Sequence, residues 1–116
     1  MKSVTKYTDN TGNASDTSGA VTATTDYLFF LAEFEIQGVH SSANQYEQNY
    51  QAQYDYYKAG NSKVKYRHDA TGTAVYHWCR SAYYDSRTNF CSVHDSGAAY
   101  AAYAYRSSGL APGFCV

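Results

Sequence analysis

The chain has little charge and no long apolar run. Only 16% of its 116 residues are charged and the net charge is −1, against roughly 25% charged residues in ordinary globular domains. This balance gives no electrostatic reason to expect a nucleic acid or an anionic membrane as partner. The longest apolar run, residues 28–32, is too short to cross a bilayer, and residues 1–7 contain no signal-peptide core. We therefore expect no membrane insertion.

Cysteine is scarce and odd in number, with Cys79, Cys91 and Cys115 in the last third of the chain. An odd count excludes a fully paired set of intrachain disulfides, and the spacings match no zinc motif. We expect the three side chains to be small buried hydrophobes. A single disulfide between Cys91 and Cys115 stays open as an alternative, and a catalytic thiol is the least favoured interpretation.

Motifs for catalysis and metal binding are also missing. The four histidines are scattered, and no phosphate loop, nucleophile elbow or zinc-binding helix motif occurs. His94, Asp95 and Ser96 have the residue types of a triad, but neighbours on an extended chain point to opposite faces. The acids after residue 55 lie in turn-forming sequence and indicate solvated surface. We expect no enzyme, no metal and no cofactor.

Tyrosine is abundant where charge is missing. The chain has 14 tyrosines and 17% aromatic residues, whereas disordered chains are poor in aromatics. A chain of this length is enough for one compact domain and not for two. We therefore expect a single folded domain over residues 1–116, with a tyrosine-rich surface.

The pattern of apolar and turn-forming residues predicts two short helices followed by a β-rich half, an α+β fold. Residues 3–7 predict a strand followed by a long surface loop, and residues 27–31 predict a buried strand. A short helix over 32–36 is stopped by Gly38. The clearest helix spans residues 42–58, begins at a Ser41 or Ser42 cap and ends at Gly60. Its tyrosines recur at helical spacing and predict a core-facing stripe of Tyr46, Tyr50, Tyr54 and Tyr57.

The second half predicts short strands joined by turns. Residues 82–89 predict a polar, aromatic loop and residues 95–97 a turn. The expected strands or extended segments span residues 63–67, 74–80, 90–93, 98–105 and 114–116.

The strongest signal is a change of composition after Trp78. Lys, Glu, Gln, Met and Trp together occur 15 times in residues 1–78 and never in residues 79–116, where about seven would be expected at the upstream rate. Tyr, Ser, Ala, Gly, Asp, Asn, Arg, His and Thr fill the tail instead. Recognition loops use the same residue types, because tyrosine gives rigid contact area and small residues let it adapt. An alanine- and serine-rich segment with no special role is the alternative.

Several blocks of the chain resemble the C-type-lectin-fold variable proteins of diversity-generating retroelements. HWCRSA at 77–82 resembles the family's W-W-L-R-S-P block, and FFLAEFEIQG at 29–38 resembles F-L-L-S-E-x-E-v-x-G. GLAPGF at 109–114 resembles G-V-x-P-x-F, and residues 46–58 resemble a Gln/Tyr-rich helix. Cys79, Ala82 and Ala111 depart from the family's usual Leu, Pro and Arg. The resemblance implies a C-type-lectin-like fold.

In that family, adenines of a template repeat are mutagenised during reverse transcription into the 3′ end of the target gene. Changes that start from the asparagine codons AAC or AAT cannot produce Lys, Glu, Gln, Met or Trp. The resemblance therefore implies a variable region over about residues 77–108, in the C-terminal domain of a longer phage or bacterial protein.

The resemblance also implies fixed residues that hold the changeable ones. The fixed set would be Trp78, Arg80, Phe90, Val93, Gly97, Pro112 and Phe114, with Trp78 in the core. Cys79 can be reached by the same codon route and would be a further changeable position. The expected contact set is His77, Tyr83, Tyr84, Asp85, Arg87, Ser92, His94, Tyr100, Tyr103, Tyr105 and Arg106.

The predicted function is recognition of a protein or other macromolecular ligand on a cell surface. The domain would be displayed on a phage virion, in a tail or receptor-binding structure, or on a bacterial cell surface, and an oligomer stays open. The first alternative is a structural or assembly domain of a phage particle. A calcium-dependent sugar lectin is less favoured because its Glu-Pro-Asn and Trp-Asn-Asp motifs are absent. An enzyme of the related formylglycine-generating fold would need cysteine pairs and a metal.

Overall fold

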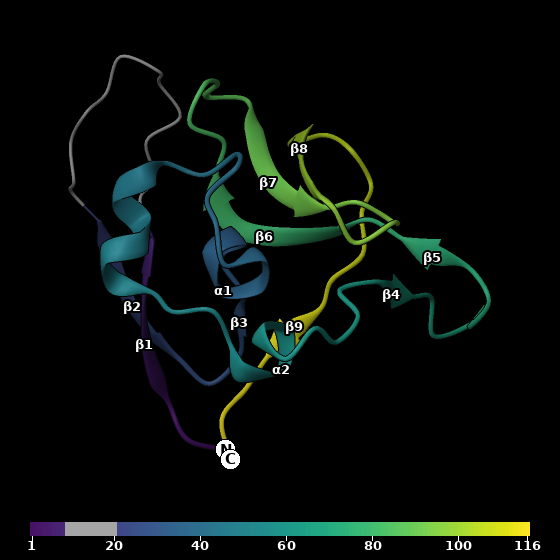
Figure 1. Ribbon diagram of the computed structural model, residues 1–116, viewed down its shortest axis with the longest axis horizontal. Coiled ribbons are helices and arrows are strands. Elements are labelled where there is room, and N and C mark those ends of the chain that lie inside the picture. The colour runs from purple at the N-terminus through teal and green to yellow at the C-terminus, as the bar shows by residue number, and fades with distance from the viewer. Residues whose placement is uncertain (9–20) are drawn as a thin grey trace.

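The computed structural model describes residues 1–8 and 21–116, and its architecture is α+β, as the sequence predicts (Figure 1). Strands predominate and the helices are short. In chain order the elements are β1 (Val4–Thr8), β2 (Thr22–Asp26), β3 (Phe29–Phe30), α1 (Glu33–Gln37), the 3₁₀ helix η1 (Gln45–Tyr50), α2 (Asp55–Lys58), β4 (Lys65–Tyr66), β5 (Ala74–Val75), β6 (His77–Ala82), β7 (Asn89–Val93), β8 (Ala99–Tyr103) and β9 (Pro112–Gly113).

The largest sheet of the described chain is antiparallel and has the order β6-β7-β8. The other strands pair two by two, β1 with β2, β3 with β9 and β4 with β5, all antiparallel. The Lys2 amide donates to the Cys115 carbonyl at 2.9 Å. The two chain ends therefore lie side by side (Figure 1).

The apolar core lies between the central sheet and the helices. Leu31 and Tyr54 pack against it from its edge. The buried cluster consists of Ile36, Ala43, Tyr57, Cys79, Cys91 and Val93.

The cysteines behave largely as expected from the sequence. Cys79 and Cys91 are 3% and 0% exposed, so they are buried hydrophobes, whereas Cys115 is only half-buried. All three thiols are free, so the alternative disulfide between Cys91 and Cys115 is not formed. Burial raises the pKa of the Cys79 and Cys91 thiols well above its ordinary value.

An ion-pair network ties the N-terminal part of the chain to the central sheet. Arg80 of β6 donates to Glu35 of α1 at 2.7 and 3.1 Å, and Lys6 of β1 donates to the same carboxylate at 2.9 Å. The Arg80 guanidinium also donates to the Phe30 and Tyr7 carbonyls. Each charge is therefore buried with partners, as a buried charge must be.

The prediction of one long helix over residues 42–58 is wrong. The chain forms η1, then an extended stretch over 51–54, then α2, and the N-cap of η1 is Asn44 in place of a serine. The break has a tertiary cause, because the Gln51 side chain donates to the Tyr7 carbonyl and the Tyr54 amide donates to the Glu35 carbonyl. Of the predicted core-facing stripe, Tyr57 is buried and Tyr54 partly buried, whereas Tyr50 is 51% exposed.

The other element predictions are confirmed to different degrees. The helix after residue 32 forms and ends at Gly38, whose φ of 74° is left-handed. The predicted strand over 27–31 is only β3, and Tyr27 and Leu28 are exposed. The loop expected up to residue 26 is wrong at residues 22–26, which form β2, and its part at 9–20 lies outside the described residues. The closing strand expected at 114–116 is replaced by β9 and the bridge at Cys115.

Candidate functional site on the outer face of the central sheet

The central sheet turns one face to the core and the other outward. Cys91 and Val93 of β7 are fully buried in the core, so Phe90 and Ser92 face the opposite way by alternation. A register shift in β6 between Trp78 and Ala82 interrupts its pairing with β7. We define the outer face as the two rows that the register forms on that side, Trp78–Ser92–Tyr100 and Ala82–Phe90–Ala102.

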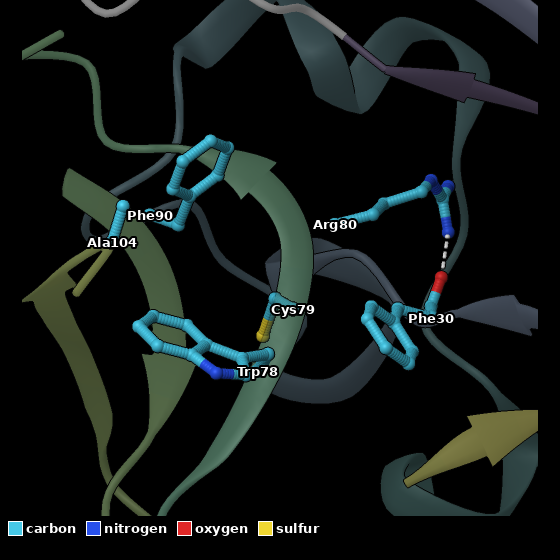
Figure 2. Close-up of a pocket in the computed structure, with 6 residues that line it drawn as sticks. All are labelled: Phe30, Trp78, Cys79, Arg80, Phe90 and Ala104. Carbon is cyan, nitrogen blue, oxygen red and sulfur yellow. Dashed lines mark hydrogen bonds between the residues drawn. The ribbon is translucent and has the colours of Figure 1, made fainter. Parts of the chain in front are cut away.

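A hollow of about 350 Å³ opens beside these rows. Figure 2 shows the Trp78 and Phe90 rings near one another, with the Arg80 side chain running away toward the Phe30 carbonyl. Because the Arg80 donors are taken by Glu35 and backbone carbonyls, the walls offer a ligand mainly apolar contact. The lining residues are Phe30, Trp78, Cys79, Arg80, Phe90 and Ala104.

Exposed and half-buried tyrosine rings lie in pairs at the central sheet. Tyr103 and Tyr105 are stacked with ring centroids 5.3 Å apart, and they are 47% and 80% exposed. Tyr83 and Tyr84, after β6, meet edge to face at 5.3 Å. Such ring pairs hold each other in place, so they present contact area to a partner with little rotamer freedom left to lose.

A third aromatic group joins the turn after β7 to the residue before β6. The Tyr76 hydroxyl lies 2.7 Å from His94 Nε2, and the Tyr100 ring contacts both rings. His94 Nδ1 lies 2.6 Å from the Asp95 carboxylate, so the ring is contacted through both of its nitrogens. Desolvation and the Asp95 charge raise the pKa of Tyr76, so the phenol keeps its proton.

This contact corrects one argument from the sequence. Neighbours on an extended chain point apart, but residues 94–97 form a turn in which His94 and Asp95 do meet. Ser96 contacts the ring through its backbone N–H, at 3.1 Å from Nδ1. The sequence triplet therefore does not form a Ser-His-Asp arrangement, and the third member of the hydrogen-bonded chain is Tyr76.

Two of the predicted contact residues are misplaced. His77 and Ser92 are 2% and 1% exposed, so the expectation that they contact a ligand on the surface is wrong. His77 opposes Val93 on the core side, and burial followed by the Lys65 charge lowers its pKa to about 4. Ser92 lies between Trp78 and Tyr100 in its row. Cys79, expected as a changeable position, is buried as well.

The remaining predicted contact residues all reach the surface. Tyr84, Asp85 and Arg87 are exposed in the loop between β6 and β7, and Arg106 is exposed after β8. Tyr83, His94 and Tyr100 are half-buried or exposed and take part in the ring groups above. The residues of the β6–β7 loop and those after β8 lie at one end of the central sheet, whereas His94 lies in the turn at the other end, so the set does not converge on one point.

The sequence reasoning missed the lining of the hollow. Phe90 and Phe114, which the resemblance implies as fixed residues, are 41% and 58% exposed. Trp78 is half-buried and lines the hollow, so it does not lie wholly in the core. The signal for Phe90 was its alternation with Cys91, which sends the two side chains to opposite faces.

The chain belongs to the DUF6273 family, whose model is described as a domain of unknown function and matches residues 1–116. No curated protein and no solved structure matches the chain. Within residues 1–8 and 21–116, no helix is long and apolar enough to span a membrane. In the same part of the chain, no group of three or more His, Cys, Asp and Glu side chains is placed to hold a metal ion.

Proposed function

We propose that this domain is a variable protein of a diversity-generating retroelement, with a C-type-lectin-like fold and an exchangeable ligand-binding surface. One observation carries the proposal. The segment that lacks Lys, Glu, Gln, Met and Trp supplies an exposed surface rich in tyrosine, around β7, β8 and the loops beside them. A composition that adenine mutagenesis would produce and a surface location coincide in one stretch of chain.

The arrangement supports exchange of side chains without loss of the fold. Tyr84, Tyr103 and Tyr105 are exposed, so changing them removes little buried area. The residues that hold the sheet are covered, because Val93 is fully buried and the side chains of the Arg80–Glu35 pair are 12% and 4% exposed. The contact set that we propose is Tyr83, Tyr84, Asp85, Arg87, His94, Tyr100, Tyr103, Tyr105 and Arg106.

The hollow beside Trp78 and Phe90 gives the tyrosine surface a pocket that a ligand side chain can fill. Binding energy at protein interfaces concentrates where a side chain fills a well-packed pocket and excludes water. Tyrosines would provide the surrounding contacts, while Asp85, Arg87 and Arg106 set charge pairing and register. The ligand we propose is a protein or other macromolecule on a cell surface, met by a phage tail or a bacterial surface protein.

The genetic test examines the DNA beside the gene. We expect a reverse transcriptase gene and a near-copy of the 3′ end that differs from it only at adenines. Sequencing the gene across a growing population should show substitutions confined to codons 77–108. The buried positions 77, 79 and 92 should stay constant or tolerate only small residues. Absence of the reverse transcriptase and of the template repeat would overturn the proposal.

The binding test separates recognition from a purely structural role in a phage particle. The change is a triple substitution of Tyr83, Tyr103 and Tyr105 to alanine, and adsorption to host cells is measured. We expect adsorption to be lost, with particle assembly and the circular dichroism spectrum of the domain unchanged. Unchanged adsorption would favour the assembly domain.

A further inference from the structure

A second cavity, of about 600 Å³, is lined mainly by residues of the β4–β5 hairpin and of the segment 107–111, and none of the tyrosine pairs lines it. The Gly109 amide donates to the Tyr76 carbonyl at 2.7 Å, and the Trp78 amide donates to the Gly109 carbonyl at 3.1 Å. These two hydrogen bonds hold the segment 107–111 beside the start of β6. A Cβ at Gly109 would lie 3.1 Å from the Tyr76 carbonyl oxygen, so glycine allows this close approach.

The charges of this cavity balance. Lys65 and Arg67 line it together with Asp69 and Asp95, and His77 is neutral at pH 7 because its pKa is lowered to about 4. Arg67 and Asp69 form a two-point pair, at 2.9 Å from Nε to Oδ1 and 2.7 Å from Nη2 to Oδ2. A cavity with no net charge gives an ionic ligand no electrostatic advantage.

The same walls are rich in groups that bind hydroxyls. After pairing with each other, the Arg67 guanidinium keeps free N–H donors and the Asp69 carboxylate keeps free lone pairs. Donors and acceptors therefore stand next to each other, which suits a hydroxyl because it both donates and accepts. Ser107 and Ser108 add two more hydroxyls to the lining. Tyr66, 57% exposed, and Tyr76 supply aromatic surface.

His77 adds an unsatisfied group to the lining. Its side chain is 2% exposed, and its Nδ1 has no hydrogen-bond partner among the described residues. A buried polar atom without a partner costs free energy that a bound polar group can recover.

We propose that this cavity binds a sugar ring. A pyranose has vicinal hydroxyls for the Arg67–Asp69 pair and an apolar C–H face for the Tyr66 ring. The cavity volume lies within the 300–1,000 Å³ common for small-ligand sites. The proposal does not depend on the retroelement, because most of the lining belongs to residues 65–77 and 107–111 rather than to the tyrosine pairs.

The test titrates the isotope-labelled 116-residue chain with the methyl glycosides of glucose, galactose, mannose and N-acetylglucosamine, each alone. At least one should shift the Gly109 amide and the His77 ring signals in nuclear magnetic resonance spectra, saturating at about millimolar concentration. Tyr66→Ala should weaken that affinity about tenfold. Asp69→Asn, which keeps the shape, should weaken it as well, and Tyr105→Ala should leave it unchanged.

Three results would overturn the sugar site. These are the absence of any shift with all four glycosides, an unchanged affinity in both Tyr66→Ala and Asp69→Asn, and a response to inorganic phosphate in place of the glycosides. The spectrum of each variant reports whether it folds. Failure of this test leaves the adsorption test of the tyrosine surface untouched, so the two proposals are judged separately.

Discussion

The Arg80 side chain connects the central sheet to three other elements of the fold. Its guanidinium donates to Glu35, to the Phe30 and Tyr7 carbonyls and to the Thr8 hydroxyl, so β6 is linked to α1, β3 and β1. The side chain is 12% exposed and that of Glu35 is 4% exposed. Removal of one partner from such a pair leaves a buried charge and buried carbonyls without partners.

Arg80→Met should therefore destabilise the domain by about 3–5 kcal/mol in urea unfolding at pH 7. Arg67→Met is the matched control, because the Arg67–Asp69 pair is exposed on both sides, and it should change stability little. Similar losses in the two variants would show that the Arg80 network adds nothing beyond an exposed pair.

The titration of the Glu35 carboxyl should make the free energy of unfolding depend on pH in the acid range. Desolvation raises its pKa, but the hydrogen bonds and charge of Arg80, with help from Lys6, outweigh this and hold the pKa below 4.5. The unfolded chain therefore binds this proton at higher pH than the folded chain does. The stabilisation that ionised Glu35 gives the folded chain should be complete above about pH 4.5 and lost as the pH falls further. Glu35→Gln should lose less stability than the wild type over that lower range.

His77 acts in a different pH window. Its pKa falls from 6.5 to about 4 on folding, so only the unfolded chain takes up the proton between these values. Stability should drop by about 3 kcal/mol as the pH falls from 6.5 to 4. In His77→Gln the free energy of unfolding should be flatter over this window, as measured by urea unfolding. An equally steep slope in the variant would assign the loss to other groups.

At the scale of elements, two glycines allow backbone strain to be separated from crowding. Gly38 ends α1 with φ 74°, and Gly60 follows α2 with φ 87°. An alanine Cβ at Gly60 would meet nothing within 4 Å, whereas one at Gly38 would lie 2.6 Å from the Gln53 side-chain oxygen. Gln53 also donates to the Ile36 carbonyl. The crowding at Gly38 would therefore disturb a bond that holds the extended stretch.

Gly60→Ala should cost about 1 kcal/mol from its left-handed backbone alone. Gly38→Ala should cost about 1 kcal/mol more, because Gln53 must move and its hydrogen bond is lost. Thermal unfolding of both variants measures the difference. Equal losses would mean that Gln53 adapts freely.

The two faces of the central sheet should respond differently to substitution. Val93→Ala, at a fully buried position, should cost about 2 kcal/mol. Tyr105→Ser, at a side chain 80% exposed, should cost no more than about 1 kcal/mol, including its stacking on Tyr103. Ser92→Tyr should cost about 3 kcal/mol because that position has no room. Equilibrium unfolding of these variants would show which positions accept exchange.

The sequence predicted elements best where local signals decide. Gly38 stops α1, and the strand predicted over residues 90–93 forms as part of β7. The helix over 42–58 failed because its break depends on the Tyr7 carbonyl, which lies 44 residues away from Gln51 in sequence. No local pattern carries that information.

The same limit applies to the candidate site. Composition pointed to the tyrosines after Trp78, and these do lie on the surface. It could not tell that Ser92 is covered by its neighbours in the row, because that depends on which residues oppose it in β6 and β8. The cavity around Gly109 likewise joins segments that are far apart in sequence.

At the scale of the whole molecule, the thiols report on opening of the core. Burial raises the pKa of Cys79 and Cys91, and only the thiolate reacts with alkylating reagents. In the folded protein iodoacetamide should modify Cys115 alone, and the other two should react at the rate of global unfolding. Mass spectrometry counts the modified thiols, and fast labelling of all three would show that the core opens locally.

The meeting of the two chain ends also sets how the domain would respond to mechanical load. A pull on both ends first strains the bond between Lys2 and Cys115, then the ends of β1 and β9 where their partner strands are antiparallel. The hydrogen bonds of these contacts would break one after another, rather than all at the same time as they do when two strands are sheared past each other. The domain should therefore yield at low force when stretched from its termini, and resist far better when pulled through residues in the middle of its central sheet.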